Sequence, residues 1–192
     1  MARKSKNTNN IEISESYKKV LAYFFSFPET SIGLNDLSKR INASKTMVKK
    51  AVLILVEKGA LKKEEIGKAW RIQANQKNAY FTTRKIAYNL QLVYESDIIA
   101  EVYKKIPEAK SIILFGSYRW GTDTEKSDID IAVEVLDSKP PRIETLKLIN
   151  QIRYRKNIKV NTHVFSRKKI DINLFTNIAN GIVLDGLLEV KP

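Results

Sequence analysis

Residues 111–135 read SIILFGSYRWGTDTEKSDIDIAVEV, and this stretch decides how the C-terminal half of the chain folds. It opens with the apolar run Ile112–Phe115, which predicts a buried strand that ends at a glycine-serine pair. A second strand is predicted further along, with Asp128 and Asp130 at its start. Because strand side chains two residues apart share a face, we expect these two carboxylates to project together.

Two adjacent carboxylates repel each other unless a cation lies between them, and oxygen ligands of this kind suit Mg²⁺. The pair Gly116-Ser117 predicts the other half of a site. Glycine lets a phosphate approach the backbone closely, the amides that open a short helix after it would point at an anion, and Ser117 adds a hydroxyl donor. A phosphate cradle beside a two-carboxylate magnesium site indicates phosphoryl or nucleotidyl transfer.

Gly116-Ser117, ten intervening residues and then Asp128-Ile129-Asp130 resemble the signature of DNA polymerase β-like nucleotidyltransferases, and most of all the minimal nucleotidyltransferases of prokaryotes. The resemblance implies an α+β domain, a small mixed sheet with helices on one side. It also implies catalytic and metal-binding roles for Asp128 and Asp130, nucleotide binding by Gly116 and Ser117, and Mg²⁺ as the cofactor. The substrate would be an NTP, ATP foremost, and the acceptor a hydroxyl, which in this family can belong to a partner toxin.

The family usually carries a third carboxylate on a later strand, and the matching position in the later strand predicted over 158–165 is Asn161. An amide oxygen can coordinate a metal weakly but cannot take a proton from an attacking hydroxyl. Two interpretations therefore stand: an enzyme, or a DNA-binding regulator or antitoxin-like protein whose degenerate domain senses nucleotide or mediates dimerisation. His163 shares a face with Asn161 and is a conceivable substitute base, although a half-exposed strand residue is the simpler interpretation.

The N-terminal part of the chain is strongly basic. Residues 1–78 hold 16 Lys/Arg and 7 Asp/Glu, which gives a net charge of +9 out of +13 for the whole chain. This excess favours a polyanionic partner, most simply nucleic acid. A lysine-rich surface without such a partner has the same composition, so charge alone does not decide between the two.

Helical spacing in this basic part predicts three helices, the third over about 45–58 with Ser44 as its N-cap and Gly59 beyond its end. Two strand-like pieces follow, and the order resembles a winged helix-turn-helix. In that fold the third helix enters the DNA major groove by its N-terminal end. The resulting candidate DNA contacts are Lys45, Thr46, Lys49 and Lys50, with Lys68 and Arg71 near the wing. The alternative is a module that binds a protein partner or dimerises.

The predicted organisation is a disordered basic arm (1–10), a winged helix (11–78), a helical connector (79–106) and a nucleotidyltransferase domain (107–192). After Pro140-Pro141 the apolar spacing predicts another helix, and Arg155 would lie near its C-terminal end. The chain has no cysteine, which excludes disulfides and thiolate metal sites. Its apolar runs are too short to span a bilayer, so we expect a cytoplasmic protein without a membrane partner; a homodimer is compatible with the sequence.

Overall fold

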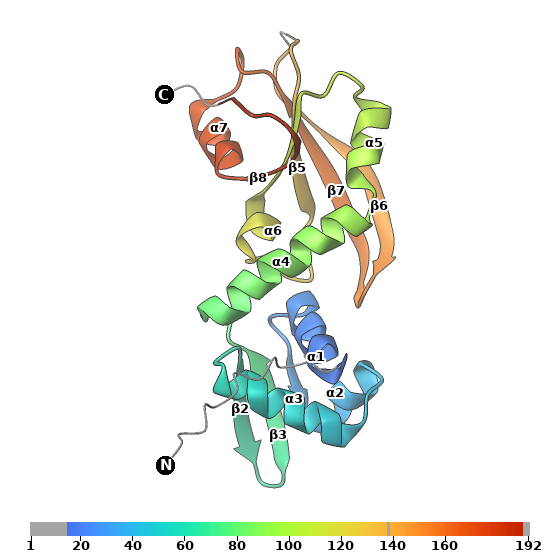
Figure 1. The fold of residues 1–192 in the computed structure, drawn as a ribbon, viewed down its shortest axis with the longest axis vertical. Coiled ribbons are helices and arrows are strands. Elements are labelled where there is room, and N and C mark those ends of the chain that lie inside the picture. Colours follow the sequence, from blue (N-terminus) through green and yellow to red (C-terminus); the bar gives the residue numbers. More distant parts are fainter. Residues whose placement is uncertain (1–14, 138, 190–192) are drawn as a thin grey trace, which may run out of the picture.

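The computed structural model describes residues 15–137 and 139–189; the predicted basic arm lies outside these ranges. Two bodies lie along one long axis, with helix α4 (Ala79–Glu95) between them (Figure 1). The N-terminal body holds three helices and a three-stranded sheet, and the C-terminal body holds a five-stranded mixed sheet with helices. The chain is therefore an α+β protein, as the sequence predicted.

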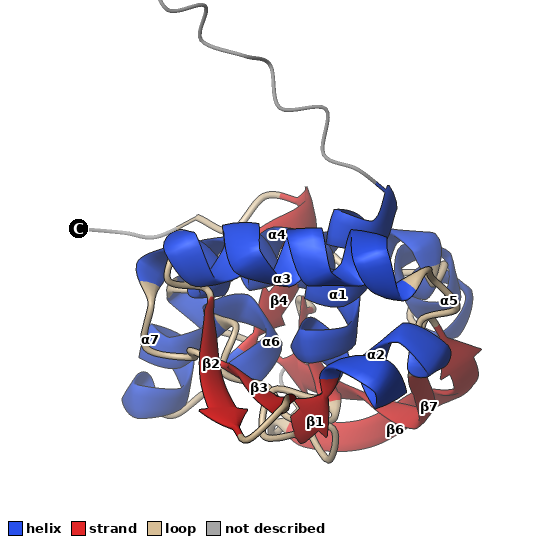
Figure 2. Cartoon of the chain, turned by 90° about the horizontal axis from the view of Figure 1, so that it is seen from below, coloured by secondary structure: helices blue, strands red, loops and turns tan. Residues whose placement is uncertain are grey.

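The N-terminal body has the element order of a winged helix. Its elements are α1 (Glu15–Ser26), β1 (Ser31–Gly33), α2 (Leu34–Arg40), α3 (Lys45–Glu57), β2 (Leu61–Ile66) and β3 (Ala69–Ala74). The strands form an antiparallel sheet in the order β1-β3-β2. Figure 2 views the molecule from this end, with β1 and β2 in front of the fainter β6 and β7.

Local sequence signals account for these boundaries. Ser44 caps α3, because its Oγ accepts a hydrogen bond from the Met47 amide at 3.4 Å. Gly59 follows α3 with a φ of +73°, a left-handed conformation that glycine adopts without strain. On the inner side of the helices, Phe24, Val52 and their apolar neighbours are fully buried and form the core of the winged helix.

Two helices connect the winged helix to the second sheet. Helix α4 begins after Asn78, whose Oδ1 accepts hydrogen bonds from the amides of Tyr80 and Phe81. It ends before Asp97, which has a left-handed φ of +54° and redirects the chain into α5 (Ile98–Lys105). No helix within the described ranges is both long and apolar enough to cross a membrane.

The C-terminal body is built around a sheet of mixed direction. Its elements are β4 (Ser111–Phe115), α6 (Gly116–Trp120), β5 (Ile129–Glu134), β6 (Arg142–Ile152), β7 (Arg155–Phe165), α7 (Ile172–Ala179) and β8 (Ile182–Gly186). The strand order is β6-β7-β5-β4-β8. Strand β5 is therefore the central strand. It runs parallel to β7, and all other neighbouring strands are antiparallel.

Helices cover both faces of this sheet, whereas the sequence predicted helices on one side only. On one face Ile129 and Ile131 of β5 are buried in a core that includes Ile98 and Val102 of α5. On the other face Ala132 and its neighbours pack against α7. The prediction of one covered face was wrong, because α5 packs on the face opposite α7.

The helix predicted after Pro140-Pro141 is also wrong, since residues 142–152 form strand β6. The apolar spacing of three residues that suggested a helix contains a β-bulge at Leu146, which interrupts the two-residue alternation of a strand. Ile143, the first apolar residue of that spacing and one that the predicted helix would turn inward, is 68% exposed. Pairing with the next strand, β7, along nearly its whole length decides the conformation, and such strand pairing overrides the local pattern.

A buried cluster of charges joins α4 to this second body. Lys85 of α4 lies 3.2 Å from Asp123 Oδ1, and Arg155 Nη1 lies 3.8 Å from Asp123 Oδ2. Asn89 Nδ2 donates a hydrogen bond of 2.6 Å to the same carboxylate. Burial lowers the pKa of Lys85, although Asp123 opposes that shift, and burial raises the pKa of Asp123. Each charge therefore depends on its partners to remain ionised.

Replacing Asp123 tests this dependence. Asp123→Asn would leave Lys85 and Arg155 buried without an anion, and we expect a loss of about 3–5 kcal/mol in the free energy of unfolding. Lys85→Met should be milder, because Arg155 remains beside Asp123. Glu95→Gln, which breaks the exposed Arg153–Glu95 pair, should change stability by less than about 1 kcal/mol. Urea unfolding of the three variants measures the differences; equal effects of Asp123→Asn and Glu95→Gln would contradict the prediction.

Candidate functional site

The two aspartates predicted as a pair lie at the start of β5. Asp130 pairs with Phe115 of antiparallel β4 on one side and with Asn161 of parallel β7 on the other. Both Asp128 and Asp130 are half-buried, while Ile129 between them is fully buried on the opposite face. The expectation that the carboxylates share a face, with the isoleucine in the core, thus agrees with the geometry of the strand.

Each aspartate has a polar neighbour on β7. Asn161 Nδ2 donates a hydrogen bond to Asp128 Oδ2 at 3.2 Å. His163 Nε2 lies 3.1 Å from Asp130 Oδ1, and its ring contacts Phe115 edge-on with centroids 4.9 Å apart. His163 is therefore part of the site, which the simpler sequence interpretation missed; its position two residues after Asn161 on one strand face was the available signal.

The glycine-serine turn lies directly against this polar row. Gly116 has a φ of +68°, and a Cβ built on it would lie 3.1 Å from Asp130 Oδ2. The missing side chain lets the backbone approach the Asp130 carboxylate. The close approach of a phosphate to this glycine, which the sequence suggested, stays a prediction. Ser117, half-buried in the first turn of α6, is brought to the same edge of the sheet.

The oxygen atoms of the site fit a hard divalent cation such as magnesium. Asp128 and Asp130 supply carboxylates, and Asn161 Oδ1 is buried without a hydrogen-bond partner. Among the described residues, no three His, Asp or Glu side chains gather in a way that could hold a metal ion. Two carboxylates with one amide oxygen could hold such a cation together with substrate phosphates, since Mg²⁺ is usually bound by one or two carboxylates and phosphate oxygens.

Some of the candidate DNA contacts line a common hollow, and the others lie outside it. Lys45, Lys49 and Lys68 line one hollow of about 360 Å³, which also contains Trp70 and Asp36. Thr46 and Lys50 are exposed on the same helix. Arg71 is also exposed, and it follows Trp70 on β3, so it alternates to the opposite face, where its Nη1 lies 3.8 Å from Glu64 Oε2.

Trp70 is a residue of this surface that sequence reasoning missed. Two lysines lie near its ring, with Lys49 Nζ at 5.4 Å and Lys63 Nζ at 4.5 Å from the centroid. These contacts fix the wing strands against the N-terminal end of α3. A tryptophan in the predicted wing, close to Lys68 and Arg71, was the signal for this role.

Comparison with known families identifies the second body. A family model described as polymerase beta, nucleotidyltransferase, matches residues 97–185. These residues therefore form a polymerase β-like nucleotidyltransferase domain, and α5 lies within the match. The boundaries 79–106 and 107–192 remain predictions.

A solved structure described as a possible transcriptional regulator from Methanosarcina mazei Go1 is 15% identical, with a TM-score of 0.32. The alignment covers 48% of this chain and 78% of that chain. A TM-score this low supports no structural argument. The winged-helix assignment therefore rests on the order of helices and strands described above. A comparison with curated proteins finds no match.

Alanine at Gly116 tests the close approach to Asp130. Gly116→Ala would force a non-glycine residue into a left-handed conformation, at about 1–2 kcal/mol, and would crowd the carboxylate. Gly67→Ala is a matched control, because Gly67 also has a positive φ, +60°, but its added Cβ would meet nothing within 4 Å. We expect Gly116→Ala to lower the midpoint of urea unfolding more than Gly67→Ala; equal losses would show that Asp130 does not constrain this glycine.

Proposed function

We propose that the C-terminal domain transfers a nucleoside monophosphate from a magnesium-bound NTP, ATP foremost, to a hydroxyl acceptor, and that the winged helix binds duplex DNA. The observation that carries the enzymatic part is the Gly116-Ser117 turn, which lies against Asp130 at the edge where Asp128 also projects. The groups proposed to bind phosphate and those proposed to bind the cation thus lie at one end of the sheet. The acceptor could be a partner protein.

The residues divide the work as follows. Asp128 and Asp130 would hold the cation, whose charge would offset that of the triphosphate. Ser117 and the amides after Gly116 would hold phosphate oxygens. The acceptor oxygen would form a bond to the α-phosphorus while the bond to the β-phosphate bridging oxygen breaks and pyrophosphate leaves. Asn161 cannot take the acceptor's proton, so that role would fall to His163, whose Nε2 lies 3.1 Å from Asp130 Oδ1.

A second function is favoured by a specific feature of the site. Asn161 stands where the family usually has an acid, and its amide bonds Asp128. A domain without that acid could bind nucleotide and not turn it over. The protein would then be a DNA-binding regulator, or an antitoxin-like protein, that senses nucleotide.

Calorimetry of ATP binding with and without Mg²⁺ tests the site itself. We expect binding that needs magnesium and that weakens at least about tenfold in Asp128→Asn and in Asp130→Asn, because each removes a charged ligand. Asp185→Asn, on edge strand β8 of the same domain, is the control and should bind like wild type. Binding of no NTP by the wild-type chain would overturn the proposal.

The same preparation separates the enzyme from the sensor. Asn161→Asp would place a third carboxylate beside Asp128, where the Asn161 amide now lies 3.2 Å away. If the missing acid limits chemistry, pyrophosphate release with candidate hydroxyl acceptors should rise at least about tenfold, because the new group can bind metal and accept a proton. Magnesium-dependent binding without release in either protein would favour the sensor.

Binding to duplex DNA tests the winged helix. Each phosphate contact lowers the slope of log K against log salt by about 0.9. Lys45→Ala/Lys49→Ala/Lys68→Ala should therefore weaken binding and make this slope shallower by up to about 2.7. A control with the same change in charge replaces three exposed lysines of the other body, Lys104, Lys156 and Lys159. Equal effects of the two triple variants would exclude the hollow as the DNA-binding surface.

A further inference from the structure

Arg155 begins strand β7 directly after the turn that joins it to β6. The sequence placed it near the end of a helix, where a cation needs no partner. In the structure it is buried, with a relative exposure of 5%. A buried guanidinium requires anions or hydrogen-bond acceptors around it, and the partners that Arg155 has lie next to the candidate nucleotide site.

The guanidinium contacts both segments that build that site. Its Nη1 donates to the hydroxyl of Tyr118, which follows Ser117 in α6. Its Nη2 donates to two backbone carbonyls in the loop before β5, Glu125 O at 3.1 Å and Ser127 O at 2.8 Å. One side chain therefore joins the phosphate-binding turn to the loop that leads into Asp128.

The loop depends on this contact because its other hydrogen bonds are largely internal. Thr124 N donates to Ser127 Oγ at 2.9 Å, and Ser127 N donates to Thr124 O at 3.2 Å. Lys85 Nζ donates to the backbone carbonyl of Asp123, where the loop begins. Among the described residues, the hydrogen bonds that reach the backbone carbonyls of residues 124–127 from outside come from Arg155. Without them the residue before Asp128 would be held only by a short local turn.

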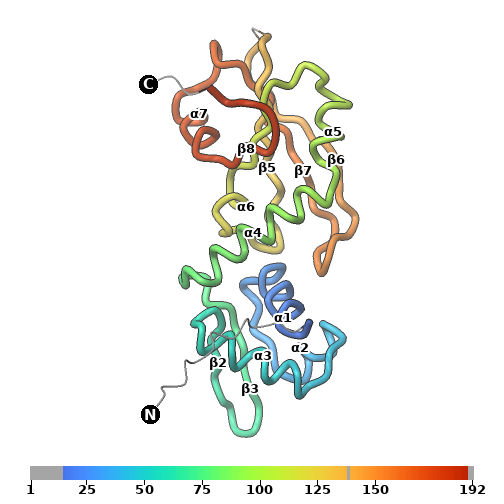
Figure 3. Tube along the Cα trace, viewed as in Figure 1, coloured from blue at the N-terminus to red at the C-terminus, as the bar shows by residue number. Residues whose placement is uncertain are grey.

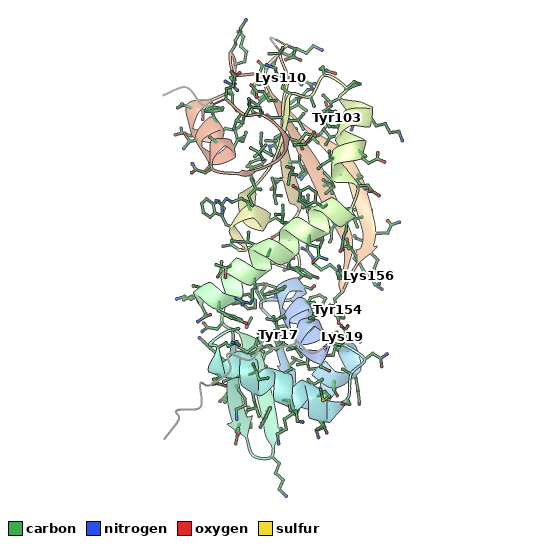
Figure 4. The ribbon with its side chains drawn as sticks, viewed as in Figure 1. Tyr17, Lys19, Tyr103, Lys110, Tyr154 and Lys156 are labelled. Carbon is green, nitrogen blue, oxygen red and sulfur yellow. The ribbon has the colours of Figure 1, made fainter. Side chains whose placement is uncertain are left out.

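The turn before Arg155 is held in place by contacts of its two residues with other elements. The neighbouring Tyr154 packs edge-on against Tyr23 of α1, with ring centroids 5.8 Å apart. Arg153, at the other end of the turn, forms two hydrogen bonds to Glu95 of α4, at 2.8 and 2.7 Å, and a lysine at this exposed position can keep the ion pair. Figure 3 shows the turn between β6 and β7 reaching down to α1. Figure 4 shows Tyr154 beside α1, where it lines a hollow together with Lys19.

We propose that Arg155 is a positioning residue for the nucleotide site: its guanidinium fixes the distance between the Gly116-Ser117 turn and the Asp128 loop. The inference rests on the proposed function and assigns Arg155 a role in it. The planar fork of arginine reaches the Tyr118 hydroxyl and both carbonyls at once, whereas the ammonium group of a lysine is a point charge on a flexible stem. Arg155→Lys therefore keeps the charge beside Asp123 and loses the bridge.

The test compares Arg155→Lys with Arg153→Lys, the same substitution two positions away at an exposed ion pair. Magnesium-dependent ATP binding is measured by calorimetry, at a temperature below the thermal unfolding midpoint of every variant. We expect Kd to rise at least about tenfold in Arg155→Lys and to stay unchanged in Arg153→Lys. Tyr118→Phe removes a single partner of the guanidinium and should raise Kd about threefold, which keeps the proposal testable if Arg155→Lys folds poorly.

Hydrogen exchange without nucleotide gives an independent reading. Amides of residues 124–128 should exchange faster in Arg155→Lys than in wild type or Arg153→Lys, while those of β5 and β7 keep their protection. Wild-type affinity or unchanged loop exchange in Arg155→Lys would overturn the assignment and leave the proposed function intact. Failure of the wild-type protein to bind any NTP would instead overturn the proposed function, and exchange would still decide whether Arg155 holds the loop.

Discussion

The buried carboxylate of Asp123 is the interaction on which the arrangement of the second domain depends. It lies between Lys85 of α4 and Arg155 of β7, and Asn89 donates a further hydrogen bond to it. Removing three charges from water is costly, and only their mutual attraction with well-placed hydrogen bonds offsets the desolvation. The cluster therefore forms only when α4, the loop before β5 and the start of β7 are all in place.

The face of the five-stranded sheet that carries the candidate site is polar at one end and apolar at the other. This difference leaves the site open. Near the start of β5 the face carries Asp130 and Asn161, and further along it carries Ala132 and Phe165. Helix α7 covers the apolar part through Ile178. Since polar groups cannot be buried under an apolar helix without partners, the polar end stays accessible, and the aspartates are only half-buried.

The sequence predicted the parts of the fold that local patterns determine. It missed those that depend on pairing between strands or on contacts between residues far apart in the sequence. The apolar run Ile112–Phe115, its glycine and the Asp-Ile-Asp alternation were enough to place β4, the turn and β5. Strand β6 was missed because a bulge at Leu146 disguises its alternation and because its conformation depends on β7. Arg155 was missed for a related reason: Tyr118, Glu125 and Ser127, which bond it, lie 28 to 37 residues earlier in the chain.

The turn before Arg155 also contacts the winged helix, so a movement of one domain can reach the other through this turn. Tyr154 contacts Tyr23 of α1, and Tyr88 of α4 packs against the apolar cores of both domains. A shift of α1 relative to β7 would displace the turn and, through Arg155, the loop before Asp128. If DNA binding produces such a shift, DNA and nucleotide must change each other's affinity by the same factor, because coupling between two binding sites is reciprocal.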